Sequence, residues 1–343
     1  MARPRKQDGT KIKGGALRSK WGAPPLFDLT IPDLETELKR LLDQIPAGRV
    51  TTYGQLADAL GLRAAARWVG EYLRDHDHTS ECPCHRVVRK EGELGLYLRG
   101  RDPEEKAQAL RREGIGVRDG LVERFPEAVF SDFKTDQPLA RLIELQHAIA
   151  ELIHQEPYDA VPPLTAGLDV SYRRDGAAVG ACAIVETASG RLVWSTTRRR
   201  LPDLPYIPSL LTFRELPLLL TLSQDALREF SDLNLFFVDG NGILHPWGAG
   251  IATCFGVVAD VPTIGVAKSL LCGKLETDGP AIEGSCPITV DGALAGAVLK
   301  RSPRAHPLYV SPGQYVDVPS ALRMTGRLDF GHRLPEPLFW ADR

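Results

Sequence analysis

The chain has 343 residues, which is too long for one average domain and fits two. Apolar residues make up 43% and charged residues 25%, so the composition is that of a soluble globular protein in which each half can bury a core. Apolar runs are too short to span a membrane, and the basic N-terminus has no apolar segment behind it. We therefore expect a cytoplasmic protein without a secretory signal or a membrane partner.

The net charge of −2 does not by itself indicate nucleic-acid binding, but the charge is unevenly distributed. Residues 1–120 carry 22 Lys and Arg against 18 Asp and Glu, whereas the remainder carries 20 against 26. This asymmetry suits a DNA-facing module joined to a carboxylate-rich one. Solvated surface is the more common explanation of such an imbalance.

The N-terminal region is predicted to be a tail followed by helices. Residues 1–25 are expected to form a basic flexible tail. A helix is predicted within residues 31–44, where a helical stripe is formed by Leu34, Leu38, Leu41 and Leu42.

Two short helices are predicted next, over residues 53–60 and 63–74. Thr52 is the expected N-cap of the first helix, and Gly61 lies between the two. Such a pair suggests a helix-turn-helix whose second helix could lie against DNA. An ordinary helical hairpin is the more common alternative for this pattern alone.

The stretch ECPCHRVVR, residues 81–89, places Cys82, Cys84, His85 and Arg86 close together. These residues are too crowded for the usual C-x₂₋₄-C zinc spacing and have no second Cys/His pair nearby, so we expect no structural zinc site. Without an export signal, we expect the six scattered cysteines to be mostly reduced. The neighbouring base and cation could make Cys84 a nucleophile. From composition alone, a structural cysteine beside a solvated histidine is the more common alternative.

The middle of the chain is predicted to join two domains. Residues 119–135 lack clear periodicity and are expected to form a linker. An amphipathic helix is predicted over residues 138–155, with an apolar stripe of Leu142, Leu145, Ile149 and Leu152.

The remainder of the chain has a different pattern. TAGLDVSY, AAVGACAIVET and RLVWSTTRRR are β-type runs joined by short turns, which predicts a meander of hairpins. A helix over residues 212–228 follows, then the buried parallel strand LNLFFVDG, a helix in GAGIATCFGVVAD and the strand PTIGVAKSLL. Antiparallel strands followed by βαβ units predict a ribonuclease H-like mixed sheet.

Three carboxylates are predicted to meet at one edge of this sheet. Asp169 lies inside an apolar strand, Asp239 ends the next buried strand, and Glu215 lies at the start of the intervening helix. Such a set suits Mg²⁺, which prefers oxygen ligands. Lys268 could add positive charge to the transition state, and His245 could orient water or a leaving group. The alternative for each residue is structural: a capping Asp, a surface Glu or a salt-bridged Lys.

Over residues 136–343 the chain resembles endonuclease V, the deoxyinosine-directed DNA repair nuclease, through GLDVSY, PYIPSLLTFRE, VDGNGILHPWGAGIATCFGV, PTIGVAKS and YVSPGQYV. The resemblance implies a Mg²⁺ site, with Mn²⁺ able to substitute, formed by Asp169, Glu215 and Asp239. It gives Lys268 and His245 catalytic roles. The implied reaction is hydrolysis of a phosphodiester 3′ to deoxyinosine, one bond beyond the lesion.

The PYIP motif resembles the family's strand-separating wedge, formed here by Pro205, Tyr206, Ile207 and Pro208. Tyr206 would fill the gap left by the extruded base. The sequence departs from the family at Ser209, where Gly is usual, and at Gln314, where a histidine near the metal site is usual. Glutamine can hydrogen-bond a phosphate or water but cannot carry a proton. A nuclease that prefers inosine in RNA, or a DNA-binding remnant, is therefore an open alternative.

Over residues 31–118 the chain is similar to the DNA-binding domain of O6-alkylguanine-DNA alkyltransferases, through IPAGRVTTYGQLADALG, AARWVG, PCHRVV, LGLY and KAQALRREG. The resemblance implies that Cys84 accepts the alkyl group. His85 would be the general base acting through a water, and Glu113 would orient that histidine. The thioether product is not regenerated, so each molecule would act once.

The same resemblance gives Tyr53, Arg67 and Tyr97 contacts with DNA. Tyr53 would help to rotate the nucleotide out, and Arg67 would fill the vacated position through the minor groove. Tyr97 would lie at the alkyl pocket. The sequence departs from the family at His76, where a hinge asparagine is usual, and at Leu98 and Arg99, where small residues are usual.

Together these patterns predict a bifunctional DNA repair protein in two domains. The N-terminal domain is expected to be mainly α with a helix-turn-helix, over residues 26–118. The C-terminal domain is expected to be an α/β nuclease over residues 136–343. The partner would be double-stranded DNA carrying O6-alkylguanine or deoxyinosine, bound by a monomer. The alternative is a first domain that only senses alkylated DNA and recruits the nuclease.

Overall fold

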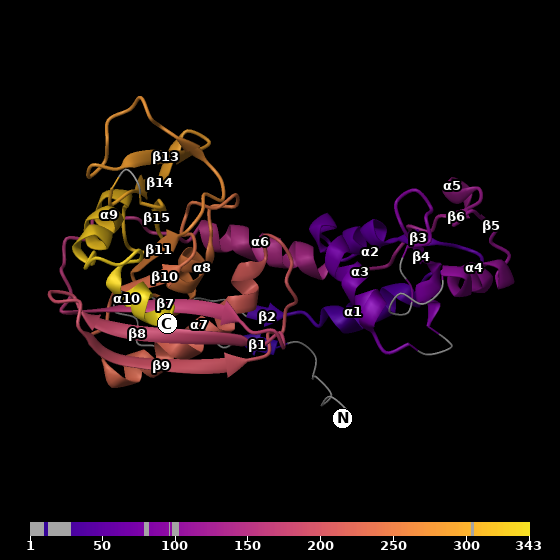
Figure 1. The fold of residues 1–343 in the computed structure, drawn as a ribbon, viewed down its shortest axis with the longest axis horizontal. Helices are drawn as coiled ribbons and strands as arrows, with labels where there is room; N and C mark the ends of the chain where they lie inside the picture. Colours follow the sequence, from indigo (N-terminus) through magenta and orange to yellow (C-terminus); the bar gives the residue numbers. More distant parts are fainter. Residues whose placement is uncertain (1–9, 13–28, 79–81, 96, 98–102, 303–304) are drawn as a thin grey trace. The chain divides into compact units, whose positions relative to one another are not determined.

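The structure, a computed structural model, describes residues 10–12, 29–78, 82–95, 97, 103–302 and 305–343. It divides into two compact units, one built mainly from residues 31–143 and the other mainly from residues 144–202 and 211–343 (Figure 1). Each unit has its own apolar core. The prediction of two domains of different architecture is therefore confirmed.

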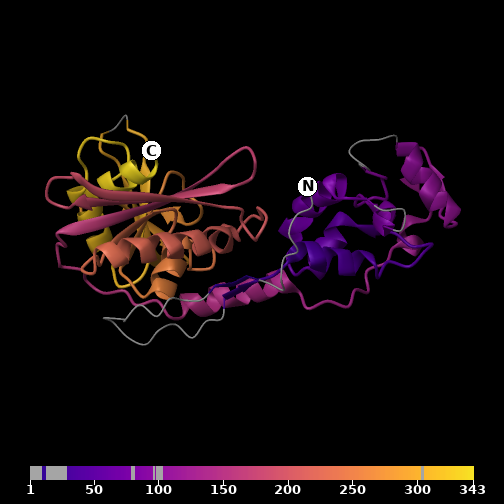
Figure 2. The same ribbon diagram turned by 90° about the horizontal axis from the view of Figure 1, so that it is seen from below.

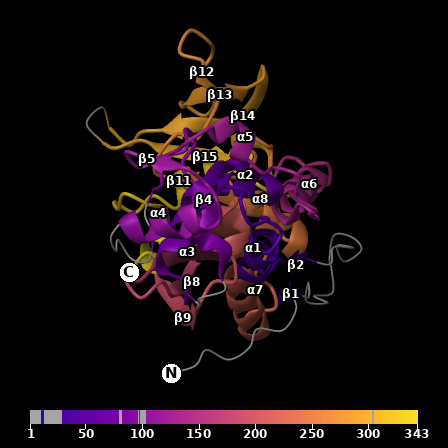
Figure 3. The same cartoon turned by 90° about the vertical axis from the view of Figure 1, so that its right-hand side faces the viewer.

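The first unit begins with the predicted helices α1 (Leu34–Leu42), α2 (Tyr53–Ala59) and α3 (Ala66–Asp75) (Figure 3). The 3₁₀ turn η1 (Arg63–Ala65) leads directly into α3. The four leucines of the α1 stripe are buried, as expected. Thr52 caps α2 by accepting a hydrogen bond from the backbone N–H of Gln55 at 3.1 Å. Gly61 has a φ of +97° between the helices, a conformation that favours glycine. The predicted helix-turn-helix is thus present.

Short elements make up the rest of this unit. They are η2 (Pro83–Arg86), α4 (Pro103–Arg112), α5 (Phe125–Ala128), and the strands β3 (Thr51–Thr52), β4 (Val87–Val88), β5 (Val117–Arg118) and β6 (Leu121–Val122). The parallel pair β3–β4 places the start of α2 beside the end of η2. This pairing brings the capped helix next to the cysteine motif.

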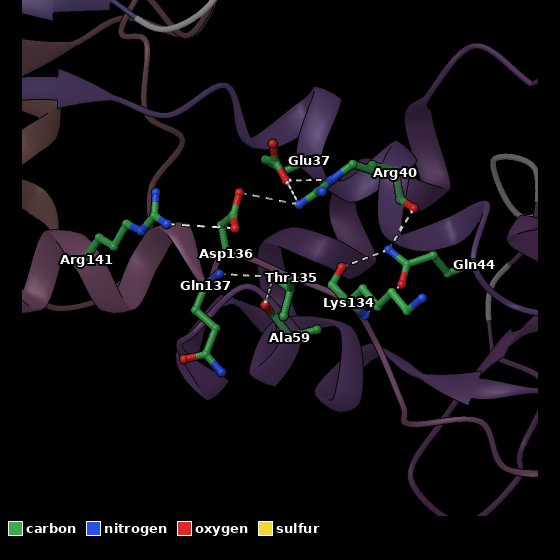
Figure 4. Close-up of polar contacts among 9 residues, drawn as sticks. All are labelled: Glu37, Arg40, Gln44, Ala59, Lys134, Thr135, Asp136, Gln137 and Arg141. Carbon is green, nitrogen blue, oxygen red and sulfur yellow. Dashed lines mark hydrogen bonds and ion pairs between the residues drawn. The ribbon is translucent and has the colours of Figure 1, made fainter.

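The segment 119–135, predicted as a linker, is instead part of the first unit. Val122 lies in the core of this unit. The Val50 backbone N–H donates to the carbonyl of Ala128 at the end of α5, and the Val50 carbonyl accepts from the N–H of Phe130. Figure 4 shows how the last residues of the segment are attached: the Thr135 hydroxyl donates to the Ala59 carbonyl at 2.6 Å, and Gln44 pairs with the backbone of Lys134. The sequence lacks periodicity here because these contacts are made by backbone and side-chain amides.

Two further predictions need correction. Thr10–Ile12 forms the strand β1, which pairs with β2 (Leu29–Ile31), so these residues of the predicted flexible tail are a strand. The rest of the tail before Leu29 lies outside the described residues. The helix predicted to reach residue 155 is α6 (Pro138–Ala150), and Leu152 follows its end with 44% of its surface exposed.

The second unit is built on a mixed sheet. In the described part of the chain this sheet has nine strands: β7 (Leu164–Tyr172), β8 (Ala178–Glu186), β9 (Leu192–Arg200), β10 (Phe236–Asp239), β11 (Thr263–Ala267), β12 (Lys274–Leu275), β13 (Cys286–Val290), β14 (Ala293–Leu299) and β15 (Leu308–Pro312). Their order is β12-β13-β14-β15-β11-β10-β7-β8-β9. β7 to β9 form the predicted antiparallel meander, and β10 runs parallel to both β7 and β11. The ribonuclease H-like mixed sheet is therefore confirmed.

Helices cover both faces of the sheet (Figure 2). They are α7 (Leu211–Glu229), α8 (Ile251–Ala259), α9 (Val318–Arg327) and α10 (Glu336–Ala341). A Cβ at Gly180 would meet Leu218 and Leu222 of α7, whereas one at Gly167 would meet the backbone of α10. Because side chains alternate along β7, Asp169 lies on the same face as Gly167, the face that α10 covers.

Candidate active sites

The carboxylate site of the second unit lies where β7, β10 and α10 come together. Oxygen atoms of Asp169, Asp239 and Asp342 all lie within 4.8 Å of one another. The pairing of Val238 with Leu168 in the parallel strands places the following residues, Asp239 and Asp169, side by side. Asp342 caps the C-terminus of α10, whose close packing on β7 brings it to the other two. The sequence predicted Asp169 and Asp239 but missed Asp342.

The charges of this cluster are only partly balanced. Lys268 donates hydrogen bonds to Asp239 Oδ2 at 2.7 Å and to Asp342 Oδ1 at 2.8 Å. These bonds outweigh burial and raise the pKa of Lys268. Burial, together with repulsion from Asp239, holds the pKa of Asp169 well above its usual range. The lysine therefore remains charged, and further positive charge near Asp169 would favour its ionised form.

Glu215 is close to the cluster but lies outside the group that meets within 4.8 Å in the described residues. It comes from α7, is 7% exposed, and accepts a hydrogen bond from the Tyr172 hydroxyl at 3.1 Å. Burial raises the pKa of Glu215 to about 7 despite this bond, and the charges of Asp169 and Asp239 add to the increase. Arg214 lies over the ring of Tyr172, with 4.6 Å between the guanidinium carbon and the ring centroid. The glutamate is therefore held at the margin of the site by its neighbours.

His245 and Gln314 are both buried, and each side chain accepts a hydrogen bond from a backbone N–H. His245 is buried, and its Nδ1 accepts a hydrogen bond from the backbone N–H of Trp247 at 3.3 Å. Burial lowers the pKa of His245 to about 4, so the imidazole is neutral near pH 7. The Gln314 side chain accepts from the His154 backbone N–H at 2.9 Å and donates to the Leu152 carbonyl at 3.5 Å. Gln314 therefore anchors the chain after α6.

The predicted wedge residues lie between β9 and α7. Tyr206 exposes 61% of its surface, whereas Ile207 exposes 1% and anchors the segment. Pro205 and Pro208 flank them. Ser209 has a φ of +72°, in the left-handed region where glycine is most stable. This conformation gives a physical reason for glycine at the corresponding position of related sequences.

The thiol site of the first unit is centred on η2. Cys84 is 4% exposed, and its Sγ lies 3.3 Å from Nδ1 of His78. His85 is directed elsewhere: its Nε2 lies 2.9 Å from Glu113 Oε1. Glu113 also accepts two hydrogen bonds from Arg86, at 2.6 and 2.9 Å. Burial would raise the pKa of Glu113, but its hydrogen bonds from Arg86 and His85 outweigh it and lower the pKa to about 2.

Two histidines complete this surrounding: His76, which the sequence analysis noted only as a departure from the family, and His78, which it did not consider. Ligand atoms of His76, His78, Cys82 and Cys84 all lie within 4.8 Å of one another. The expectation that no second Cys/His pair lies near the motif was therefore wrong. The hydrogen bond between the two sulfurs raises the pKa of Cys84, together with burial, and lowers the pKa of Cys82.

The residues predicted to contact DNA differ in their exposure and in their neighbours. Tyr53 begins α2, and Arg67 lies in the first turn of α3 with 84% of its side chain exposed, paired with Glu71 at 2.9 Å. Tyr97 is 8% exposed, and its ring lies 5.7 Å from that of His78. Burial raises the pKa of Tyr97 to about 12. Leu98 and Arg99, which the sequence analysis singled out, lie outside the described residues.

Lys106 is a buried charged residue that the sequence analysis missed. It is 1% exposed and donates hydrogen bonds to the carbonyls of Val87 and Leu94. Burial lowers the pKa of Lys106 to about 7. In the sequence it is one of five charged residues on the helix PEEKAQALRR, so only the fold distinguishes it.

Comparisons with known proteins match both units. Residues 147–343 match the endonuclease V family, and residues 33–115 match the DNA-binding domain of 6-O-methylguanine DNA methyltransferases. The class is therefore a fused methyltransferase and endonuclease of DNA repair. A bifunctional methyltransferase/endonuclease of Thermoplasma volcanium is 34% identical over 292 residues, which cover 85% of this chain and 83% of that protein. The chain belongs to the family of bifunctional methyltransferase/endonucleases, in which endonuclease V forms the larger part.

Solved structures support the fold of the second unit. The catalytic domain of human endonuclease V superposes with a TM-score of 0.54 at 28% identity, covering 61% of this chain and 94% of that one. Endonuclease V of Ciona intestinalis, solved with a 24mer DNA containing an inosine followed by a ribo-adenosine, gives a TM-score of 0.53 at 25% identity and covers 60% of this chain and 95% of that one. Within the part of the chain that the structure describes, helices are too short or too polar to cross a bilayer.

Proposed function

We propose that the second unit cleaves the phosphodiester 3′ to deoxyinosine in DNA, one bond beyond the lesion, with Mg²⁺ as cofactor and Mn²⁺ able to substitute. The observation that carries this proposal is the carboxylate cluster of Asp169, Asp239 and Asp342 beside Lys268. The inosine-containing DNA bound by the Ciona endonuclease V supports the choice of lesion. We assign this activity to residues 136–343.

The donor set fits a divalent cation. Glu215 is buried and Asp169 half-buried, and the pKa values of both are raised by burial and by neighbouring acids, so a bound cation would relieve both costs. Asp169, Glu215 and Asp239 would hold the ion, with Asp342 completing the acidic surface. Bound Mg²⁺ would supply Lewis acidity and a polarised water. Lys268 places an ammonium where a scissile phosphate gains negative charge. Because Nδ1 of neutral His245 accepts from Trp247, its Nε2–H is left to donate one hydrogen bond.

The wedge segment would open the duplex. Tyr206 presents an exposed ring on a segment anchored by Ile207, which suits stacking in the gap left by an extruded base. Pro205 and Pro208 limit the conformations of the segment, so the ring needs little ordering on binding.

For the first unit we propose a single transfer of the O6-alkyl group of guanine to Cys84, assigned to residues 26–118. The Sγ–carbon bond forms as the carbon–O6 bond breaks, and guanine keeps the electron pair. The thiol proton passes through a water to His85, whose position is fixed by Glu113 at 2.9 Å. Tyr53, Arg67 and Tyr97 would hold the flipped nucleotide. Double-stranded DNA carrying either lesion would bind to a monomer.

One observation favours a second candidate, a first unit that senses alkylated DNA without transfer. The Cys84 sulfur lies within 4.8 Å of the Cys82 sulfur and 3.3 Å from His78 Nδ1, while His85 is engaged with Glu113. A sensor would bind O6-alkylguanine and recruit the nuclease. Transfer would need the Cys84 thiol to leave these partners.

The decisive experiment for the nuclease is Mg²⁺-dependent nicking of a duplex with one deoxyinosine. We expect nicking by the wild type and loss of nicking in Asp169→Ala. An unaffected variant would refute the site. A matched RNA duplex with one inosine separates DNA from RNA preference: faster cleavage of the RNA would replace the proposed substrate.

A further inference from the structure

Four side chains in the first unit surround a common point with a donor set that the proposed chemistry does not use. They are His76, His78, Cys82 and Cys84, whose ligand atoms all lie within 4.8 Å of one another. Two are sulfurs and two are imidazole nitrogens. We propose that these residues form a Zn²⁺ site with two thiolate and two imidazole ligands.

The two measured sulfur–nitrogen distances are close to those around a tetrahedral zinc ion. With Zn–S of about 2.3 Å and Zn–N of about 2.05 Å, a sulfur and a nitrogen on one ion lie about 3.5 Å apart. Nε2 of His76 lies 3.3 Å from Sγ of Cys82, and Nδ1 of His78 lies 3.3 Å from Sγ of Cys84. The two N–S pairs therefore need to move by only a few tenths of an ångström to accept the ion.

The surroundings orient the histidine ligands. His76 is the C-cap residue of α3, and its Nδ1 lies 2.9 Å from the Leu73 carbonyl, which fixes the tautomer and leaves Nε2 free of a proton. The ring of Tyr72 stacks on that of His76 with 5.7 Å between centroids. The edge of the His78 ring faces Tyr97 at 5.7 Å. A backbone carbonyl behind a histidine is the usual support of a zinc ligand.

The donor set selects the class of ion. Two thiolates and two imidazoles in tetrahedral geometry favour Zn²⁺, whereas Mg²⁺ prefers oxygen ligands and six-coordination. Each thiol loses its proton to solvent on binding, so two thiolates neutralise the ion's charge. A neutral complex suits a site where Cys84 is 4% exposed. The ligand spacing, H-x-H-x₃-C-x-C, differs from common zinc motifs because each pair is separated by one residue.

The site would also control the thiol, a consequence that rests on the proposed transfer function. Zinc and the alkyl group would compete for the same Cys84 sulfur, because a thioether is a far weaker zinc ligand than a thiolate. Zinc-loaded protein is then protected from alkylation, and alkylation releases zinc.

The first test measures zinc binding to the full chain. Protein stripped with a chelator is titrated with Zn²⁺ against a chromophoric competitor, with Mg²⁺ in excess to occupy the carboxylate site. We expect one tightly bound Zn²⁺ per chain, and affinity at least about 100-fold weaker in Cys82→Ser and His76→Gln. Cys272→Ser, which changes a free cysteine of the second unit, is the matched control and is expected to bind like the wild type.

A spectroscopic arm identifies the donors. Co²⁺ in a tetrahedral thiolate site absorbs strongly in the visible range, so the wild type is expected to colour and Cys82→Ser to lose most of the absorption. Zinc affinity that is the same in wild type, Cys82→Ser and His76→Gln would overturn the proposal. A disulfide between Cys82 and Cys84 that persists in reducing buffer would also overturn the proposal.

The last arm separates this proposal from the transfer function. Zinc-loaded and zinc-free proteins are compared for methyl transfer from O6-methylguanine DNA. Slower transfer in the loaded form supports both proposals. Tight zinc binding with no transfer in either form refutes the transfer function and leaves the zinc site standing, whereas equal transfer in both forms refutes Cys84 as a ligand.

Discussion

The carboxylate site and the thiol site handle buried ionisable groups in opposite ways. In the second unit three aspartates and Glu215 share one nearby ammonium, Lys268, so negative charge is in excess. In the first unit the thiols and histidines hydrogen-bond to one another, and Glu113 is fully engaged by Arg86 and His85. The carboxylate site needs a cation to balance its charge, whereas the polar groups of the thiol site are hydrogen-bonded to one another. The availability of the thiol, rather than of the carboxylates, is therefore the point on which function depends.

The largest expected effects come from separating the two activities. Asp169→Ala should reduce nicking by at least about 100-fold and leave methyl transfer intact, because the two sites lie in different units. Cys84→Ser should abolish transfer and leave nicking intact. Both activities are measured on duplexes carrying one lesion each.

The control for the first substitution is Asp175→Ala. This carboxylate lies in the turn after β7, is exposed, and pairs with Arg199 at 2.7 Å. It should nick like the wild type. Loss of both activities in either Asp169→Ala or Cys84→Ser would contradict the division of labour between the units.

Lys268→Gln should have the next largest effect. Removing an ammonium that bonds both Asp239 and Asp342 takes positive charge from the reacting phosphate and should lower kcat for nicking by about 100-fold. Lys274→Gln, an exposed lysine on β12, is the matched control. Nicking at the wild-type rate in Lys268→Gln would show that this lysine only stabilises the fold.

Glu113→Gln should weaken the first unit by about 2 kcal/mol at pH 7, because hydrogen bonds from Arg86 and His85 to a charged acceptor are lost. The folded pKa of Glu113 lies near 2, below its ordinary value of 4.5. Its contribution to stability is therefore complete above pH 4.5 and is lost as the pH falls toward 2. Unfolding in denaturant across this range should show the decline in wild type and a flatter profile in the variant.

Glu93→Gln provides the comparison for that measurement. Glu93 pairs with Arg89 at 3.0 Å on the surface, with about half of each side chain exposed, so its loss should change stability little. Equal effects of the two substitutions would mean that burial of the Glu113 network does not matter.

The smallest expected effect is a gain. Ser209 has a φ of +72°, so Ser209→Gly should stabilise the folded state by about 1 kcal/mol, seen as a higher Tm. Ser209→Ala keeps the strained conformation and should show no gain. A gain of the same size in both variants would attribute the effect to the lost hydroxyl.

Much of the fold was predictable because its patterns are local. The β7–β9 meander follows from alternation, and Thr52 follows from its capping chemistry. The segment 119–135 was mistaken for a linker because it is attached by backbone pairing at Val50 and by Gln44, contacts that leave no periodic signal. The helices α9 and α10 were not predicted, although the N-cap Asp317 and the proline in the turn that follows it are a start signal for α9 that the sequence carries.

The sites divide along the same line. Asp169 and Asp239 could be placed because adjacent parallel strands align their neighbouring residues. Asp342 could not, because it reaches the cluster only through the packing of α10 on Gly167. His76 was noted only as a departure from the alkyltransferase family, and His78 was missed, because their one-residue spacing resembles no common ligand motif. Only the turn after α3 brings them to the cysteines.

The central claim is that one chain combines a single-use thiol with a nuclease that turns over, and one measurement tests it directly. Wild-type protein is incubated with an excess of duplex carrying both O6-methylguanine and deoxyinosine, and its peptides are weighed while nicked strands are counted. We predict no more than one methyl group per chain, carried by the peptide that holds Cys84, and many nicks per chain. An unmodified Cys84 peptide with continued loss of O6-methylguanine, or with no loss at all, would contradict the claim.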